Sequence, residues 1–126
     1  MNAASKSVLV VDDEEDFRLL IRHHVEVNLR GTVYEADTGQ HALDLAAHCK
    51  PALIVMELEL PDIDGFEAIE KIKANPTTAA TPILALSNYC QHPEWKLRAL
   101  GSGCALCIDK GDFSTEGVTA LHRLLG

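Results

Sequence analysis

Short runs of apolar, often β-branched residues alternate along the chain with stretches whose apolar residues recur every three or four positions. The first pattern is typical of strands buried on both faces of a sheet, and the second of helices with one buried face. The sequence therefore predicts five strands, each followed by a helix. The expected strands cover residues 7–11, 32–36, 52–58, 82–86 and 104–108.

The expected helices are marked by apolar stripes and by residues that begin or end a helix. The first is expected to end at Gly31 and the second to begin near Thr38. The third is expected to end at Pro76, and Pro93 is suited to begin the fourth. The stripes are Phe17, Leu20, Ile21 and Val25 in the first helix, Phe66, Ile69 and Ile72 in the third, and Val118, Leu121, Leu124 and Leu125 in the last.

Strands that alternate with helices require a parallel sheet with helices on both faces. We therefore expect one α/β domain over residues 1–126, a flavodoxin-like, doubly wound (βα)5 fold with strand order 2-1-3-4-5. The chain is long enough for one core and too short for two. In such a sheet, ligands bind beyond the carboxyl ends of the strands, where the strand order reverses.

Composition narrows the class of protein. The content of 47% apolar and 24% charged residues is ordinary for a soluble domain. No apolar run is long enough to cross a bilayer, and the start "MNAASKS" lacks the pattern of a signal peptide. The expected location is therefore the cytoplasm. The formal net charge of -8 argues against binding of nucleic acid or of an anionic membrane by this domain.

The cysteines raise the question of a redox or zinc site. Cys104 and Cys107 have CxxC spacing, but residues three apart on a strand point to opposite faces of the sheet. No second Cys/His pair completes a tetrahedral zinc site. We therefore expect reduced, structural cysteines at Cys49, Cys90, Cys104 and Cys107. The histidines are scattered over helices and loops and are assigned no ligand role: His23, His24, His41, His48, His92 and His122.

Polar residues follow the strands at their carboxyl ends, and a doubly wound sheet brings these ends into one crevice. Carboxylates that face one another there are costly unless a cation neutralises them. A lysine supplies one positive charge, and a hard divalent ion such as Mg²⁺ could supply more. The residues are Asp12 and Asp13 after the first strand, Glu57 in the third, Ser87 after the fourth and Lys110 after the fifth.

Each of these residues also has a simpler interpretation. The two aspartates could cap the first helix, Ser87 could be a loop hydroxyl and Lys110 a surface lysine. Their common place at one edge of the sheet favours the pocket. Asp62 and Asp64, by contrast, are expected to form a turn.

Taken together, these motifs resemble the response-regulator receiver domains of two-component signalling. The matching stretches are "VVDDEEDFR", "LIVMELELPDIDGFE", "ILALS" and "CIDKG", in the order and spacing of the family. In receivers an acid pair binds Mg²⁺, an aspartate four residues before a proline accepts phosphate, and a Ser/Thr and a lysine contact that phosphate. The resemblance implies that Asp12 and Asp13 are the acid pair, Ser87 the hydroxyl, Lys110 the lysine, and the backbone carbonyl of Glu59 a further member of the metal pocket.

Three positions depart from the family pattern. The phospho-acceptor position holds Glu57, the switch aromatic is replaced by Cys107, and the proline after the lysine by Gly111. The bond before Gly111 is expected to be trans, because a cis bond before a residue other than proline costs roughly 3 kcal/mol. Glutamate carries its carboxylate about 1.5 Å farther out than aspartate. It would obstruct an incoming phosphoryl group and could instead approach Lys110 and Ser87.

These features leave three functions open. The first is a pseudo-receiver that is not phosphorylated on the usual residue and acts as a protein-interaction module. The second is a phospho-accepting regulator whose acceptor was changed to glutamate as a phosphomimic. The departures at Cys107 and Gly111 favour the first. A flavodoxin-like enzyme is disfavoured, because the acidic loop "DDEED" would repel a flavin phosphate. A phosphatase-like enzyme would place its nucleophile in this loop, but nothing else of that pattern is evident.

The resemblance also implies partners and a cofactor. A histidine kinase, a phosphotransfer protein or another signalling protein is the expected partner. Trp95 and Arg98, on the fourth helix, are candidates for the partner face, although Trp95 could equally be a core residue. Binding of Mg²⁺ is expected to be weak or absent, because a displaced carboxylate beside Lys110 disturbs the octahedral geometry that this ion demands.

Overall fold

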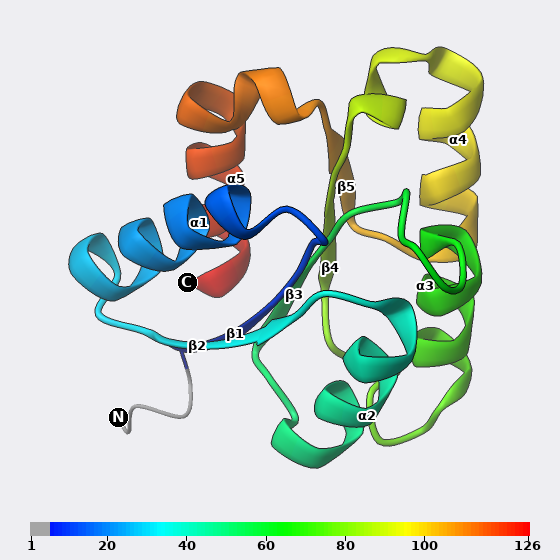
Figure 1. The fold of residues 1–126 in the computed structure, drawn as a ribbon, viewed down its shortest axis with the longest axis horizontal. Helices are drawn as coiled ribbons and strands as arrows, with labels where there is room; N and C mark the ends of the chain where they lie inside the picture. Colours follow the sequence, from blue (N-terminus) through cyan, green and yellow to red (C-terminus); the bar gives the residue numbers. More distant parts are fainter. Residues whose placement is uncertain (1–5) are drawn as a thin grey trace.

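The computed structural model describes residues 6–126 and has a five-stranded parallel sheet of order β2-β1-β3-β4-β5 (Figure 1). The expected doubly wound α/β fold is therefore confirmed. The expected absence of a signal peptide rests partly on residues 1–5, which lie outside the described residues. The strands are β1 (Ser7–Val11), β2 (Thr32–Ala36), β3 (Leu53–Met56), β4 (Ile83–Leu86) and β5 (Leu106–Ile108).

Helices cover both faces of the sheet. Figure 1 shows α1 (Glu15–Asn28) and α5 (Val118–Leu125) on one face, and α2 (Gly39–Cys49), α3 (Gly65–Ala74) and α4 (Pro93–Ser102) on the other. Every residue of β1, β3 and β4 is buried, which explains their continuous apolar runs. Within residues 6–126, none of the helices has the length and apolar character needed to cross a membrane.

Several element boundaries differ from the predictions; β3, for example, ends at Met56 instead of residue 58. The first helix ends at Asn28, before Gly31, and Arg30 takes the left-handed conformation (φ 55°) in the turn. Gly31 is needed for another reason, since a Cβ there would lie 2.5 Å from the backbone oxygen of Lys6. The last strand begins at Leu106 instead of residue 104, because the amide of Cys104 still bonds to the oxygen of Ala99 in α4.

The apolar stripe of α1 is also narrower than predicted. Ile21 and Val25 are buried, whereas Leu20 is 49% exposed. Leu20 lies with Phe17 and Phe113 along a groove between α1 and α5. Leu20, at the edge of the apolar stripe, is therefore partly exposed to solvent.

Helix starts explain the acids of the "PDIDG" loop. Asp64 accepts a hydrogen bond from the amide of Glu67 at 2.8 Å and is the N-cap of α3. Asp62 accepts bonds from the amides of Gly39 and Gln40, at 2.7 and 2.8 Å, at the start of α2. The prediction that both merely form a turn is thus corrected, because both satisfy helix N–H groups.

The ladder of the sheet extends one residue past three strands. The amide of Asp12 donates to β2 at 3.0 Å, that of Glu57 to β1 at 2.9 Å and that of Ser87 to β5 at 3.2 Å. All three residues are therefore fixed by backbone bonds at the same edge of the sheet.

A pair of histidines at the junction of α1 and α5 predicts a pH dependence of stability. His24 Nε2 lies 3.2 Å from His122 Nε2, and burial, together with His122 and His23, lowers the pKa of His24. The unfolded chain then binds the proton more readily, so stability should fall as the pH drops below about 6.5. Urea denaturation at several pH values should show a flatter profile for His24→Asn, and an unchanged one for the exposed His48→Asn.

Candidate functional site

Lys110 is the common partner of the acids at the carboxyl edge of the sheet. Its Nζ lies 2.8 Å from Asp12 Oδ2, 2.8 Å from Glu57 Oε1 and 2.6 Å from Glu14 Oε1. The side chains of Asp12 and Glu57 are 3% and 7% exposed, whereas that of Glu14 is 65% exposed. One ammonium group is thus shared by two buried carboxylates and one at the surface.

The pKa shifts follow from this arrangement. Burial by itself would lower the pKa of Lys110, but hydrogen bonds to Asp12, Glu14 and Glu57 raise it above its ordinary value. Burial raises the pKa of Asp12, an effect that Lys110 and the amide of Glu14 oppose. The hydrogen bond to Lys110 lowers the pKa of Glu14. Lys110 therefore stays charged at neutral pH and supports buried carboxylates that are costly without it.

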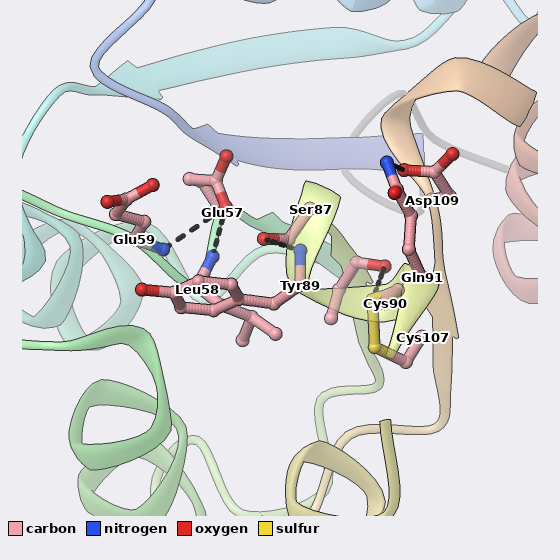
Figure 2. Close-up of a disulfide and its surroundings, with 10 residues drawn as sticks. Glu57, Leu58, Glu59, Ser87, Tyr89, Cys90, Gln91, Cys107 and Asp109 are labelled. Carbon is pink, nitrogen blue, oxygen red and sulfur yellow. Dashed lines mark hydrogen bonds between the residues drawn. A yellow bond between two sulfur atoms is a disulfide. The ribbon is translucent and has the colours of Figure 1, made fainter. Parts of the chain in front are cut away.

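Glu57 uses both oxygens of its carboxylate. Oε1 contacts Lys110, while Oε2 accepts hydrogen bonds from the amides of Leu58 at 2.6 Å and Glu59 at 3.1 Å (Figure 2). The extra methylene lets the carboxylate turn back over the loop that follows β3 while still reaching the lysine. Glu59 thus donates a hydrogen bond from its backbone amide to Glu57. The sequence predicts a role for its backbone carbonyl only.

Ser87 and Asp13 lie apart from this ion-pair cluster. The hydroxyl of Ser87 accepts a bond from the amide of Tyr89 at 3.2 Å and caps the short 3₁₀ turn η2 (Asn88–Gln91) (Figure 2). Within residues 6–126 the structure records no hydrogen bond between Ser87 and Glu57. Of the two expected contacts of Glu57, the structure therefore shows a bonded contact with Lys110. Asp13 is exposed at the rim.

A cleft of about 510 Å³ opens beside Glu57 and Asp13. Carboxylate side chains dominate its lining, which would repel anions entering from solvent. The lining residues are Asp13, Glu14, Glu57, Glu59, Leu60, Pro61 and Asn88.

Lys110 occupies the place that a divalent metal ion would need between the carboxylates. Oxygens of Asp12 and Glu57, which such an ion would need, are bonded to Lys110. In the part of the chain that the structure describes, no group of three or more His, Cys, Asp or Glu side chains is arranged to hold a metal ion. The residues as placed do not fit Mg²⁺, because the ammonium of Lys110 already occupies the position between the carboxylates.

The expectation of four reduced cysteines is wrong. Cys90, in η2, and Cys107, in β5, form a disulfide, with their Cα atoms 5.7 Å apart (Figure 2). Cys49 and Cys104 are free thiols. The CxxC spacing drew attention to Cys104, but the pairing depends on β4 and β5 being neighbours. The feature of the sequence that points to this pairing is the predicted strand order combined with the short turn after Ser87.

Tyr89 and Trp95, after β4, form an aromatic cluster with Phe66 of α3 that the sequence reveals only in part. Trp95 is half-buried and stacks on Tyr89 and Phe66, with ring centroids 5.3 and 5.8 Å away. The guanidinium of Arg98 lies 4.1 Å from the centre of the Phe66 ring. Trp95 therefore joins the core and reaches the surface at once, so its two interpretations are compatible.

Two residues that contact the site were not singled out from the sequence. Glu14 was not singled out from the acidic run, although it contacts Lys110 directly. Arg18 was also missed; it donates to the backbone oxygen of Asp12 at 2.7 Å. The expected trans bond before Gly111 is confirmed, because all peptide bonds of the described residues are trans.

Comparison with known proteins gives a consistent result. Residues 8–121 match the family model described as the response regulator receiver domain. The chain is 30% identical to the polar-differentiation response regulator DivK of Brucella anthropi, over 96% of this chain and 97% of that protein. It is 38% identical to the transcriptional regulatory protein KdpE of Escherichia coli over 93% of this chain, and spans 52% of KdpE.

A solved structure agrees with these matches. The chemotaxis protein CheY4 of Vibrio cholerae is 25% identical and superimposes with a TM-score of 0.84, over 94% of this chain and 97% of that one.

Proposed function

This chain belongs to the family of response regulator receiver domains, and on that premise we propose that it is a pseudo-receiver. It is not phosphorylated on the usual residue and acts as a protein-interaction module of two-component signalling. Members of this family interact with histidine kinases and other signalling proteins, and a protein of that kind is the proposed partner. The proposed location is the cytoplasm, and the domain itself is not an enzyme.

The observation that carries this proposal is the state of Glu57. Both of its oxygens accept bonds, from Lys110 on one side and from the amides of Leu58 and Glu59 on the other. In-line transfer requires an acceptor oxygen that is free and correctly placed, and an error on the order of 1 Å can reduce the rate about a hundredfold. A carboxylate held in this way is a poor acceptor of a phosphoryl group.

The alternative of a phosphomimic finds partial support in the contact between Glu57 and Lys110. A carboxylate carries less charge and fewer acceptor oxygens than a phosphoryl group, and the hydroxyl of Ser87 is engaged with Tyr89 instead of Glu57. Cys107 stands where the family has its switch aromatic, and it forms a disulfide with Cys90. The module is therefore proposed to work without the usual phosphate-driven switch.

Treatment with acetyl phosphate or a beryllofluoride analogue tests the proposal directly. We expect no mass increase and no change in the amide NMR spectrum, because Glu57 is engaged and the cleft is acidic. Intact mass spectrometry measures the covalent reaction with acetyl phosphate, and the amide NMR spectrum measures binding of the beryllofluoride analogue. A stable increase by one phosphate that maps to Glu57 would contradict the proposal.

Binding of Mg²⁺ is expected to be weak or absent. The ion would have to displace Lys110 from Asp12 and Glu57, and it demands near-octahedral oxygen ligands. NMR titration with MgCl₂ should therefore give shifts that do not saturate below the millimolar range. Saturable binding well below millimolar, centred on residues 12, 13 and 57, would show that the lysine is easily displaced.

A further inference from the structure

We infer that Cys90 and Cys107 are a redox-controlled pair, a thiol–disulfide couple that sets the conformation of the segment between β4 and α4. In a cytoplasmic protein, a disulfide between two such residues is usually transient and not structural. The inference rests on the proposed function in two respects, the cytoplasmic location and the role in protein interaction, and it takes the surface of α4, β5 and α5 as the interaction face. It does not depend on phosphate chemistry at Glu57.

The position of the pair carries the inference. Cys90 lies three residues after Ser87, and Cys107 three residues before Lys110, at the place of the family's switch aromatic. The disulfide joins the turn η2 to strand β5, 17 residues apart in sequence (Figure 2). It therefore cross-links the two segments that lead to the hydroxyl and lysine positions of the pocket.

The disulfide also lies next to Tyr89, one of the aromatic residues that stack on Trp95 of α4. Tyr89, next to Cys90, stacks on Trp95 with ring planes 20° apart. Gln91, on the other side of Cys90, donates to Asp109 Oδ1 at 3.1 Å. The disulfide at Cys90 restrains its neighbours Tyr89 and Gln91. When the disulfide is reduced, only non-covalent contacts hold η2 against β5.

Thiol–disulfide exchange with a small-molecule disulfide, such as oxidised glutathione, is the reaction that closes the pair. The thiolate of one cysteine attacks the small disulfide and releases one small thiolate, leaving a mixed disulfide. The second cysteine's thiolate attacks the protein sulfur of that mixed disulfide and releases the other. Two protein thiols are oxidised, one small disulfide is reduced to two thiols, and the protons lost by the cysteines are taken up by the released thiolates.

The other two cysteines differ from this pair, Cys104 in its reactivity and Cys49 in its place in the fold. Burial raises the pKa of Cys104 to about 11, so its reactive thiolate is scarce at neutral pH. Cys49 lies on α2, which packs on α3 and β2, away from β5. Cys49 and Cys104 therefore serve as internal controls when the oxidation state of the pair is measured.

A groove beside the pair connects it to the interaction face. Cys107 contributes to the lining of a cavity of about 530 Å³ over β5, with Lys96 and Leu100 of α4 and Thr119 and Arg123 of α5. A change in the position of β5 or η2 would alter the shape of this groove. The redox state of the pair is thereby linked to the surface that a partner would meet.

Equilibration of the wild-type protein in buffers of graded reduced and oxidised glutathione tests the inference, with no phosphate donor present. After quenching and alkylation under denaturing conditions, mass spectrometry should count four alkylated cysteines at the reducing end and two at the oxidising end, reversibly. The amide NMR spectrum should stay that of a folded protein throughout. Residues 87–98 and 106–109 and the indole of Trp95 should shift with the same midpoint.

Variants separate the pair from the other thiols. Cys90→Ala should abolish the transition, whereas Cys49→Ala and Cys104→Ala should keep its midpoint within about a factor of three in the glutathione ratio. The inference is overturned if the wild-type pair stays closed at the reducing end, or never closes. It is also overturned if closure leaves Trp95 and the amides of α4 unchanged. The wild-type measurements decide these outcomes even where a variant does not fold.

Discussion

Replacing Lys110 with methionine is expected to lower the free energy of unfolding by about 3–5 kcal/mol at neutral pH. The variant leaves Asp12 and Glu57 buried without the cation that both contact at 2.8 Å. Methionine keeps most of the length of the apolar stem but removes the ammonium nitrogen, which also lies 4.8 Å from the centre of the Phe17 ring. Loss of charge compensation, and not loss of packing, would therefore dominate the effect.

The pH dependence of this variant has a definite sign. Without the lysine, the pKa of Asp12 in the folded state should rise further above its unfolded value. The folded state then binds more protons, so part of the lost stability should return as the pH falls from about 7 toward 5. Urea denaturation at both pH values measures this recovery.

Lys71→Met is the matched control, because Lys71 pairs with Glu67 on the exposed face of α3. Its effect should stay within about 1 kcal/mol. The double variant Lys110→Met with Glu57→Gln should recover part of the loss, because it removes one of the stranded charges. If Lys110→Met costs no more than the control, the buried carboxylates do not depend on this lysine.

The fold was predictable because each strand run is buried on both faces, and such runs are hard to confuse with amphipathic helices. The ends of elements were less predictable. The end of α1 is set by the left-handed Arg30 and by the close approach of Gly31 to Lys6, neither of which has a distinct pattern in the sequence.

The candidate site was predictable only as far as strand order determines it. Asp12 and Glu57 follow the neighbouring strands β1 and β3, and Lys110 follows β5 at the same carboxyl edge of the doubly wound sheet and reaches both of them. The bonds of Glu57 to two loop amides depend on the local backbone path, and apolar periodicity carries no information about that path. The pairing of Cys90 with Cys107 required combining strand order with the length of the turn η2, which the spacing of cysteines alone does not reveal.

Substitution of Glu57 by aspartate is expected to restore phosphorylation by a small donor. The shorter side chain withdraws its carboxylate by about 1.5 Å, which frees it from the amides of Leu58 and Glu59 and leaves room for a phosphoryl group. With acetyl phosphate and Mg²⁺, uptake should be at least about a hundredfold faster than in the wild-type protein. Intact mass spectrometry over time measures it. Glu57→Gln, which keeps the size of the side chain and removes the nucleophile, should take up no phosphate.

The output of a receiver is not expected to return with the phosphate. Cys107 is too small to fill the space that an aromatic residue would occupy when Ser87 moves, and Gly111 leaves the chain after Lys110 without the family's proline. Phosphorylation of the aspartate variant should therefore change the NMR spectrum near the pocket and leave α4, β5 and α5 largely unaltered, in both oxidised and reduced protein. Large, cooperative shifts across these three elements would reveal a working switch and would favour the phosphomimic. Failure of the variant to take up any phosphate would mean that Lys110, and not the length of residue 57 alone, closes the pocket.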